Sequence, residues 1–364
     1  MTLREPVLFP IHEKSAKEIS EFEGWRTPLF YRSLKDEHYA VRNHVGVFDV
    51  SHMKRSLIRG AGAAKYLSEI LTVDASRLKI GKMKYCLLLN EKAGIIDDGT
   101  VLRTGDDEYL LTTNAATDLK VHNWIRSFAP STVNIEDVTD STVLLAIQGP
   151  RAIELVPKLL NYDVSGLKWF TGTFLKHVGI DIIVTRSGYT GEDGFELLIK
   201  SGNYQEAGKI WNNIISLGAV PCGLAARDIL RLEASYPLSQ VDFDDSTTPV
   251  EARLEWAIQL EGHEFVGKKA FEEILRTSPI RFLVGIELEE PGVPRRGMEI
   301  FDDTKKVGYI TSGNLSPTLK KGIALGYVTS KVAEKDHVIK VKIKDEYREA
   351  RIKLGPFISL KIPR

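Results

Sequence analysis

The stretch LIRGAGAAKYLSEIL at residues 57–71 returns in altered form as AIQGPRAIELVPKLL at residues 146–160. Each copy shows the end of an apolar strand, then a glycine, then an amphipathic helix. The segments downstream also correspond, since residues 107–128 and residues 193–218 both predict a strand followed by a helix. Two copies about ninety residues apart indicate a duplicated α+β unit and not a solenoid, which needs three or more repeats.

A hairpin-like stretch lies between the helix and the downstream strand of each copy. It reads KYCLLLNEKAGIIDDGTVLR at residues 84–103 in the first copy and HVGIDIIVTRSGYTGEDGFELL at residues 177–198 in the second. Apolar runs broken by polar, glycine-containing turns are typical of such hairpins. We therefore predict two related α+β subdomains within residues 1–275, with repeats near 57–128 and 146–218.

The character of the sequence changes after about residue 275. No long helical period follows, and short strand-like segments alternate with polar turns. We predict an all-β, barrel-like domain over residues 276–364, joined to the rest of the chain at TSPIR, residues 277–281. The strand-like segments are RFLVGIEL, KKVGYITS, KKGIALGYV and HVIKVKIKDEYREARIKL.

The composition is that of a globular protein without a strong net field. The chain has 364 residues, 43% of them apolar, and its 49 basic side chains balance 49 acidic ones. This balance argues against a nucleic-acid partner held by a strong positive field. The two cysteines, Cys86 and Cys222, form no C-x-x-C pair, which argues against a metal knuckle or a redox motif. Neither a signal peptide nor a run of about eighteen apolar residues is visible, so we expect a cytoplasmic protein that contacts no membrane.

The short motifs of several common catalytic classes are absent from the sequence. The eight histidines include no H-E-x-x-H pattern or other close metal-ligand spacing, so we expect no bound metal. Neither a G-x-S-x-G elbow nor a G-x-x-x-x-G-K phosphate loop occurs. Ser51 and His52 are neighbours in DVSHM, but the side chains of strand neighbours diverge, so these two do not form a nucleophile and its base.

One unusual stretch is AGIIDDGTV, residues 93–101, in which Asp97 and Asp98 follow two isoleucines. Successive side chains of a strand point to opposite faces, so the two acids cannot act together on one substrate. At most one of them points inward, where its charge costs free energy unless a partner compensates it. The alternative interpretation is a solvated turn between two strands.

A second unusual stretch is SGYTGEDGFELLI, residues 187–199, with glycines at positions 188, 191 and 194. One interpretation is a wide turn, because glycine permits positive φ angles. The other interpretation concerns Glu196, which lies in the strand after the turn between Phe195 and Leu197. An acid at this position could bind a ring that carries several N–H donors.

The third unusual stretch is CGLAARDILRLEA, residues 222–234. Arg227 and Arg231 are four residues apart on one face of the predicted helix, in otherwise apolar company. Either they form structural ion pairs, with Asp228 or Glu233 as partners, or they anchor an anionic or polar ligand.

Taken together, these stretches resemble the glycine cleavage system T-protein (aminomethyltransferase) family over nearly the whole chain. So many matches in one order are far more specific than any single match. The resemblance implies an α+β fold in which two interleaved, duplicated folate-binding domains and a C-terminal β-barrel domain form a cloverleaf around a central channel. The matching stretches are FEGWRTPLFY (22–31), HVGVFDVSHM (44–53), GIIDD (94–98), RSGYTGEDGFE (186–196), GLAARDILRLEA (223–234), TPVEARLEW (248–256), FVGKKAF (265–271) and TSGNLSPTLKKGIALGYV (311–328).

The resemblance also implies an activity. Members of the family bind tetrahydrofolate as a co-substrate, without a metal. They take an aminomethyl group that the lipoyl arm of the partner H-protein carries, release ammonia and leave 5,10-methylenetetrahydrofolate. An ionised carboxylate in the channel can orient the amine nucleophile and stabilise the positive charge that develops during the transfer, without covalent catalysis.

Individual residues acquire roles from the same resemblance. Asp98 matches the catalytic acid that faces the folate near N5 and N10, and Asp97 would then face away. Glu196 matches the residue that hydrogen-bonds the edge of the pterin. Other folate-lining positions of the family are matched by Tyr85, Asn114, Phe170, Tyr189 and Arg227.

The sequence departs from the family pattern in two places. Gly99 stands where the family usually has a leucine, and SYPLSQVDFDD, residues 235–245, replaces a tyrosine–glycine segment that helps to shape the channel. An alternative reading is therefore another tetrahydrofolate-dependent methyl or one-carbon transferase of the demethylase type. A further alternative is a non-enzymatic folate-binding protein, although the K-G-C-Y-x-G-Q-E-type motif of such relatives is absent.

Overall fold

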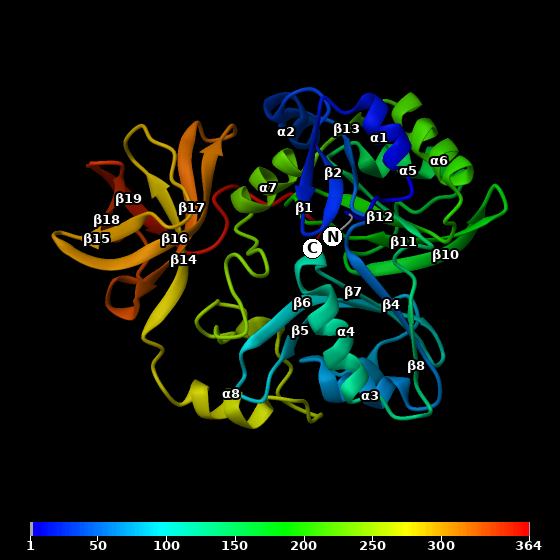
Figure 1. The fold of residues 1–364 in the computed structure, drawn as a ribbon, viewed down its shortest axis with the longest axis horizontal. Helices are drawn as coiled ribbons and strands as arrows, with labels where there is room; N and C mark the ends of the chain where they lie inside the picture. The colour runs from blue at the N-terminus through cyan, green and yellow to red at the C-terminus, as the bar shows by residue number, and fades with distance from the viewer. Residues whose placement is uncertain (1–2, 364) are drawn as a thin grey trace.

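The computed structural model describes residues 3–363. Its strands form a five-stranded sheet, a six-stranded sheet, a closed barrel and a two-stranded hairpin. The two sheets with their helices and the barrel make three lobes (Figure 1). Helices accompany both sheets, whereas the barrel is built from strands. The predicted α+β fold with a C-terminal barrel is therefore confirmed.

The first repeat folds as the five-stranded sheet, in which the strand order is β5-β6-β7-β4-β8 and neighbouring strands are antiparallel. Apolar side chains of two helices, including Leu67 and Val121, pack against the sheet in one buried cluster. The elements of this first unit are β4 (Lys54–Arg59), α3 (Ala63–Ile70), β5 (Met83–Leu89), β6 (Ile95–Gly105), β7 (Glu108–Thr113), α4 (Asp118–Ser127) and β8 (Asn134–Asp137).

The second repeat folds as the six-stranded sheet, with the order β10-β11-β12-β9-β3-β13. This order repeats that of the first sheet, except that one strand, β3, is inserted before the last one. The duplication predicted from the sequence is therefore confirmed. The elements of this second unit are β3 (Gly46–Asp49), β9 (Val143–Gln148), α5 (Ala152–Leu160), β10 (Thr171–His177), β11 (Ile180–Arg186), β12 (Gly194–Ile199), α6 (Tyr204–Ser216) and β13 (Val220–Pro221).

The two units are interleaved along the chain. The inserted strand β3 comes from the N-terminal segment, which precedes the first unit in sequence but joins the second sheet. After the second unit the chain returns to the first one, where Phe243 and Phe271 share a buried cluster with Leu87 and Ile95 of the β5–β6 hairpin. The segments involved contain α1 (Phe9–Ser15), β1 (Glu18–Phe22), β2 (Trp25–Phe30), α2 (Leu34–Asn43), a 3-10 turn η3 (Glu255–Ala257) and α8 (Lys268–Leu275).

A common apolar core joins the two sheets. Leu57 and Leu102 from the first unit lie in one buried cluster with Leu144 and Ile183 from the second. Burial of such side chains on both partners stabilises the pair by about 1.5–3 kcal/mol for each large apolar group. The relative position of the two sheets is consequently set by packing.

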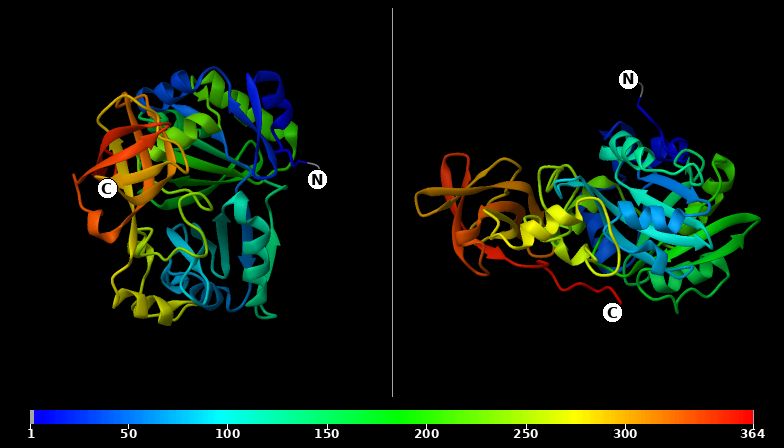
Figure 2. Two further views of the ribbon diagram at one scale, coloured as in Figure 1. Left: turned by 60° about the vertical axis from the view of Figure 1, so that its left-hand side comes forward. Right: turned by 90° about the horizontal axis from the view of Figure 1, so that it is seen from below.

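The barrel closes through the strand order β14-β17-β16-β15-β18-β19. It lies to one side of the two units, and the last part of the chain runs back from it toward them (Figure 2). The predicted boundary between residues 275 and 276 falls in the connection from α8 to β14 and stays a prediction. The barrel strands are β14 (Arg281–Leu288), β15 (Glu299–Asp302), β16 (Lys305–Ser316), β17 (Lys321–Thr329), β18 (Val338–Ile343) and β19 (Glu346–Lys353).

Helix α7 (Leu224–Glu233) connects the barrel to the two units. Its Leu232 packs against Leu283 and Ile323 of the barrel. Its Arg231 pairs at 2.7 Å with Asp242, and both side chains are buried. Within residues 3–363, no helix combines the length and the apolar character needed to cross a membrane.

Candidate functional site

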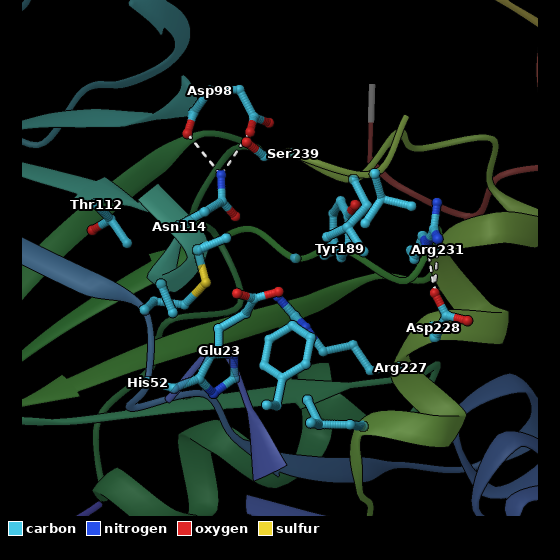
Figure 3. A pocket seen from close by; sticks show the side chains of 18 of the residues that line it. Glu23, His52, Asp98, Thr112, Asn114, Tyr189, Arg227, Asp228, Arg231 and Ser239 are labelled. Atoms are coloured by element: carbon cyan, nitrogen blue, oxygen red, sulfur yellow. Dashed lines mark hydrogen bonds and ion pairs between the residues drawn. The ribbon is translucent and has the colours of Figure 1, made fainter. Parts of the chain in front are cut away.

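A cavity of about 470 Å³ lies where the two sheets, α7 and the barrel meet. Its walls come from the β1–β2 hairpin, both units, α7, the segment after α7 and Asn314 of β16. Figure 3 shows side chains from these separate elements pointing toward one another. All seven predicted site residues line this cavity: Tyr85, Asp98, Asn114, Phe170, Tyr189, Glu196 and Arg227.

Asp98 lies near the start of β6 and faces the cavity. The hydroxyl of Tyr85 donates to its Oδ2 atom at 2.8 Å, and the side-chain amide of Asn114 donates to its Oδ1 atom at 2.7 Å. Burial and the nearby charge of Asp97 raise the pKa of Asp98 to about 7, although the two hydrogen bonds lower it. This carboxyl therefore changes its charge close to neutral pH.

Asp97 faces away from the cavity, as the alternation of a strand predicts. It is nevertheless fully buried, so the alternative of a solvated turn is wrong, and so is the expectation that at most one acid points inward. Its Oδ2 atom accepts from the backbone N–H of Asn114 at 3.0 Å and from Thr117 at 2.6 Å. Its Oδ1 atom accepts from the amide of Asn114 at 2.9 Å and from Ser239 at 2.7 Å. Burial raises the pKa of Asp97 and outweighs these four hydrogen bonds, which lower it.

Gly99 follows the acid pair because β6 and β7 approach each other closely there. A Cβ atom at this position would lie 2.3 Å from the carbonyl oxygen of Thr112 in β7. A side chain would have to push the two strands apart, since the obstacle is backbone. The departure from the family pattern at Gly99 is therefore matched to the local backbone beside Asp98.

Glu196 lies on β12 and presents its carboxylate to the cavity. The hydroxyl of Ser187 donates to its Oε2 atom at 2.5 Å, and Ser187 is in turn within 2.8 Å of the hydroxyl of Thr185. The glycine-rich segment before β12 does make a turn, with Gly191 at a φ angle of 78°. The interpretation of a wide turn is therefore confirmed, and the interpretation of Glu196 as an acid that binds a ring with N–H donors stays a prediction.

The two arginines of α7 have different surroundings. Arg231 is buried and binds Asp228 at 2.8 Å and Asp242 at 2.7 Å, which fits the structural interpretation. Glu233, the other suggested partner, instead binds Arg42 at 2.7 Å, so that suggestion is wrong.

Arg227 instead fits the interpretation of a ligand anchor. Its guanidinium lies 4.9 Å from the centroid of the Tyr189 ring. Its Nη1 atom is buried and has no hydrogen-bond partner within the described part of the chain. This leaves a donor next to the cavity.

Four aromatic side chains line the cavity: Phe22, Tyr85, Phe170 and Tyr189. Tyr189 stacks on Tyr236 with ring centroids 5.7 Å apart, and its hydroxyl donates to a backbone carbonyl at 2.6 Å. Tyr85 stacks on Trp256 at 5.2 Å. Phe170 adopts a φ angle of 55°, a left-handed conformation that is uncommon for a bulky residue. Such rings offer flat surfaces on which a heteroaromatic ligand can pack.

Several cavity residues escaped the sequence reasoning. His52 lines the cavity, with the ring of Phe22 edge-on at 5.5 Å. Burial and the nearby charge of Arg227 lower the pKa of His52 to about 3, so this imidazole is neutral at physiological pH. Ser239 was noted only as part of a divergent segment. The prediction for the DVSHM stretch is only that Ser51 and His52 form no nucleophile and base, so His52 is not among the predicted site residues.

The arrangement suits a planar ligand with several N–H donors and a positively charged reacting centre. Glu196 can accept hydrogen bonds from the ligand, and Arg227 can donate one. Asp98 supplies a carboxyl group with a pKa of about 7, which is ionised or neutral depending on the pH. Among residues 3–363, no three His, Cys, Asp or Glu side chains converge in a way that could hold a metal ion. The expectation that no metal binds stays a prediction.

Comparisons with known proteins agree with this geometry. Residues 8–262 match the family described as GCVT N-terminal domain, and residues 281–358 match the glycine cleavage T-protein C-terminal barrel domain. The chain is 38% identical over 361 residues to an aminomethyltransferase of Geobacillus thermodenitrificans, covering 98% of each chain. It is 36% identical to one of Halothermothrix orenii, covering 98% of this chain and 100% of the relative. A crystal structure of glycine cleavage system aminomethyltransferase T from Bartonella henselae covers 100% of both chains, with 33% identity and a TM-score of 0.92.

Proposed function

Because the chain belongs to the glycine cleavage T-protein family and is an aminomethyltransferase, we propose that its central cavity binds tetrahydrofolate and receives the one-carbon unit there. The donor in this proposal is the aminomethyl group on the lipoyl arm of H-protein. The carbon leaves the sulfur and the nitrogen of the donor and becomes bonded to N5 and N10 of the folate. The products are ammonia, 5,10-methylenetetrahydrofolate and H-protein with a free dihydrolipoyl thiol, and the two protons that leave N5 and N10 of the folate balance the ammonia and the thiol.

The strongest support is the convergence of all seven predicted residues on one cavity. A volume of about 470 Å³ lies within the usual range of small-molecule sites. Glu196 has the position and the acceptor atoms to bind the N–H donors of a pterin edge. The ring of Tyr189 offers a stacking surface, and Arg227 Nη1, which has no partner in the described part of the chain, offers a further hydrogen bond.

Asp98 is the proposed catalytic residue. In its ionised form it accepts hydrogen bonds from Tyr85 and Asn114, which fix the carboxylate in one orientation. That carboxylate can orient the attacking amine and stabilise the positive charge on the carbon during transfer. Its raised pKa also lets it hold a proton that the reaction releases.

One observation favours a second candidate function. The divergent segment contributes Leu238, Ser239 and Val241 to the cavity wall. A change of wall residues is a way to change the donor while the folate site stays the same. The alternative is therefore a tetrahydrofolate-dependent transferase that acts on a free methylated amine or sulfonium compound.

An assay with both donors separates the two functions. Aminomethylated, lipoylated H-protein should yield ammonia and methylenetetrahydrofolate in equal amounts, and unlipoylated H-protein should serve as the inactive control. Full activity on a free methylated donor, with none on H-protein, would transfer the proposal to the second function.

Binding of the folate can be tested without any donor. Tetrahydrofolate at a hundredfold excess over its dissociation constant should stabilise the fold by about 2.7 kcal/mol. Protein treated with EDTA should respond equally, since the proposal includes no metal. The absence of any thermal shift would count against the folate site. The cytoplasmic location stays a prediction.

A further inference from the structure

The side-chain amide of Asn114 lies between the two acids of β6. Its nitrogen donates to Asp97 Oδ1 at 2.9 Å and to Asp98 Oδ1 at 2.7 Å. We propose that Asp97 is a positioning residue that holds Asn114 against Asp98 and sets the pH range in which Asp98 is ionised, and that Ser239 keeps Asp97 in this role. The inference rests on the proposed function, because it concerns the acid that this function makes catalytic.

Asp97 is held from three separate parts of the chain. Asn114 follows β7, Thr117 lies in the turn before α4, and Ser239 lies in the segment after α7. Asp97 does not line the cavity, whereas Asn114 and Ser239 do. It therefore cannot touch a ligand in the cavity, and any effect on the reaction must pass through its neighbours.

The geometry leaves Asn114 little freedom. Besides its two side-chain contacts to the acids, its backbone N–H donates to Asp97 Oδ2 at 3.0 Å. Asp97 consequently accepts hydrogen bonds from both the main chain and the side chain of Asn114. An amide fixed in this way presents its remaining N–H to Asp98 in one direction, which fixes the orientation of the Asp98 carboxylate in turn.

The charge of Asp97 also acts on Asp98 directly. On β5 the titratable neighbours of Asp98 are Tyr85, which donates to it, and Cys86, which lies in the core of the first unit. Burial raises the pKa of both, so they are neutral at physiological pH. Burial likewise raises the pKa of Tyr189 on the segment before β12. A neighbouring negative charge makes ionisation of Asp98 harder, so Asp97 raises the pH at which Asp98 loses its proton.

Five other charged side chains line the same cavity from other elements: Glu23, Glu196, Arg227, Asp228 and Arg231. Glu196 presents its carboxylate from β12, and Arg227 presents its guanidinium from α7. Their charges have opposite signs. All five stay in place when Asp97 is changed, so the effect of Asp97 can be measured against a constant background.

The test is the pH profile of kcat/KM for Asp97→Asn with H-protein as donor. The raised pKa of Asp98 means that activity requiring its ionised form is lost as the pH falls through about 7. Removing the charge of Asp97 takes away one cause of this rise. The acidic limb should therefore move to lower pH, by roughly one unit, and the rate at the optimum should also fall because Asn114 is less well fixed.

Asp74→Asn is the matched control. Asp74 is a buried carboxylate of the same unit, held by Ser68 and Ser76, but it does not line the cavity. Its substitution should lower the melting temperature without moving the acidic limb. A limb that stays in place in Asp97→Asn would overturn the proposal, and so would an equal movement in both variants.

A readout without activity separates this inference from the proposed function. The carboxyl carbon of Asp98 in protein labelled with ¹³C-aspartate can be assigned by its loss in Asp98→Asn and titrated by NMR. Its midpoint should fall in Asp97→Asn, whether or not the protein accepts H-protein. An inactive wild-type enzyme would therefore reject the function alone, whereas an unmoved midpoint would reject the inference alone.

Ser239→Ala keeps the proposal testable if Asp97→Asn does not fold. It removes one donor to Asp97 and leaves both charges in place. It should lower turnover severalfold in the wild-type background and have no further effect in Asp98→Asn, because its influence passes through Asp98. An equal loss in both backgrounds would show a purely structural role and overturn the proposal.

Discussion

The two repeated units share one topology but differ in the chemistry at equivalent positions. Gly99 pairs with Thr113 at the end of β7, and Ile182 pairs with Ile199 at the end of β12. The residue that precedes Gly99 is Asp98, and the residue that precedes Ile182 is Asp181. The two carboxylates are therefore topological equivalents.

Their surroundings are nevertheless opposite. Asp98 lines the cavity, whereas the Asp181 side chain is 64% exposed and lies 3.5 Å from Lys176. The β10–β11 hairpin that carries Asp181 points away from the barrel (Figure 1). The position of a carboxylate in the repeat therefore does not determine whether it can act on a ligand. What distinguishes Asp98 is its burial in the cavity wall next to the neutral donors Tyr85 and Asn114.

Glu196 shows the same difference between the two units, because here the acid belongs to the second unit and its equivalent in the first unit is apolar. It lies three residues before Ile199, and the equivalent residue of the first unit is Leu110, which is buried in the core between the sheets. The two hairpin regions thus contribute acids from non-equivalent strands. The cavity is a composite of one end of each unit and not a symmetric pair of sites.

The largest expected effect comes from Asp98→Asn. Turnover with H-protein should fall roughly 10²-fold or more, because a positioned charge is lost from the reacting centre. The melting temperature should stay unchanged or rise, since a buried carboxylate is costly without its ligand. Steady-state rates and thermal melts measure both.

Asp181→Asn is the matched control for Asp98→Asn. It removes the equivalent carboxylate of the second unit, whose exposed pair with Lys176 is worth at most about 1 kcal/mol. Turnover should not change. Equal losses in the two variants would break the comparison between the units.

The next effect concerns Glu196→Gln. This substitution keeps the shape and removes the charge-assisted hydrogen bond to the ligand, which is worth about 1.5–3 kcal/mol. The dissociation constant for tetrahydrofolate should rise roughly ten- to a hundredfold. Calorimetric titration gives the constant directly.

Glu154→Gln provides the control for Glu196→Gln. Glu154 lies on α5 of the same unit with an exposed side chain, away from the cavity. Folate affinity should be unaffected by its substitution. An unchanged affinity in Glu196→Gln would mean that this acid does not contact the pterin.

The smallest expected effect comes from Gly99→Ala. Its Cβ would meet the carbonyl oxygen of Thr112 at 2.3 Å, so the variant should lose about 1–3 kcal/mol of stability. The equivalent position of the second unit holds Ile182 without difficulty, which sharpens the contrast between the two strand pairs. Urea unfolding measures the loss.

Gly166→Ala is the comparison for Gly99→Ala, because no atom lies within 4 Å of its added Cβ. Its stability should not fall. An unchanged stability in Gly99→Ala would show that β6 and β7 can separate without cost, and that the glycine is not required by the backbone.

Much of the fold could be predicted from the sequence because the relevant signals are local. The repeat of strand, glycine and helix at residues 57–71 and 146–160 reports backbone geometry within a few residues. The short strands after residue 275 report the barrel in the same way. The ordered family motifs supplied the candidate residues around the cavity, and these lie together in the structure.

The connections among those residues could not be predicted, because they depend on contacts between distant parts of the chain. Ser239 donates to Asp97 across 142 positions of sequence. Arg227 and Arg231 share one helix face, yet only the tertiary structure decides that Arg231 is paired and that Arg227 Nη1 has no hydrogen-bond partner among residues 3–363. The alternation of a strand places Asp97 and Asp98 on opposite faces, but only the fold determines that both faces are buried and that one amide bridges the two charges. The physical reason is that periodicity specifies the direction of a side chain, whereas its charge state depends on the solvent and the donors that the folded chain places around it.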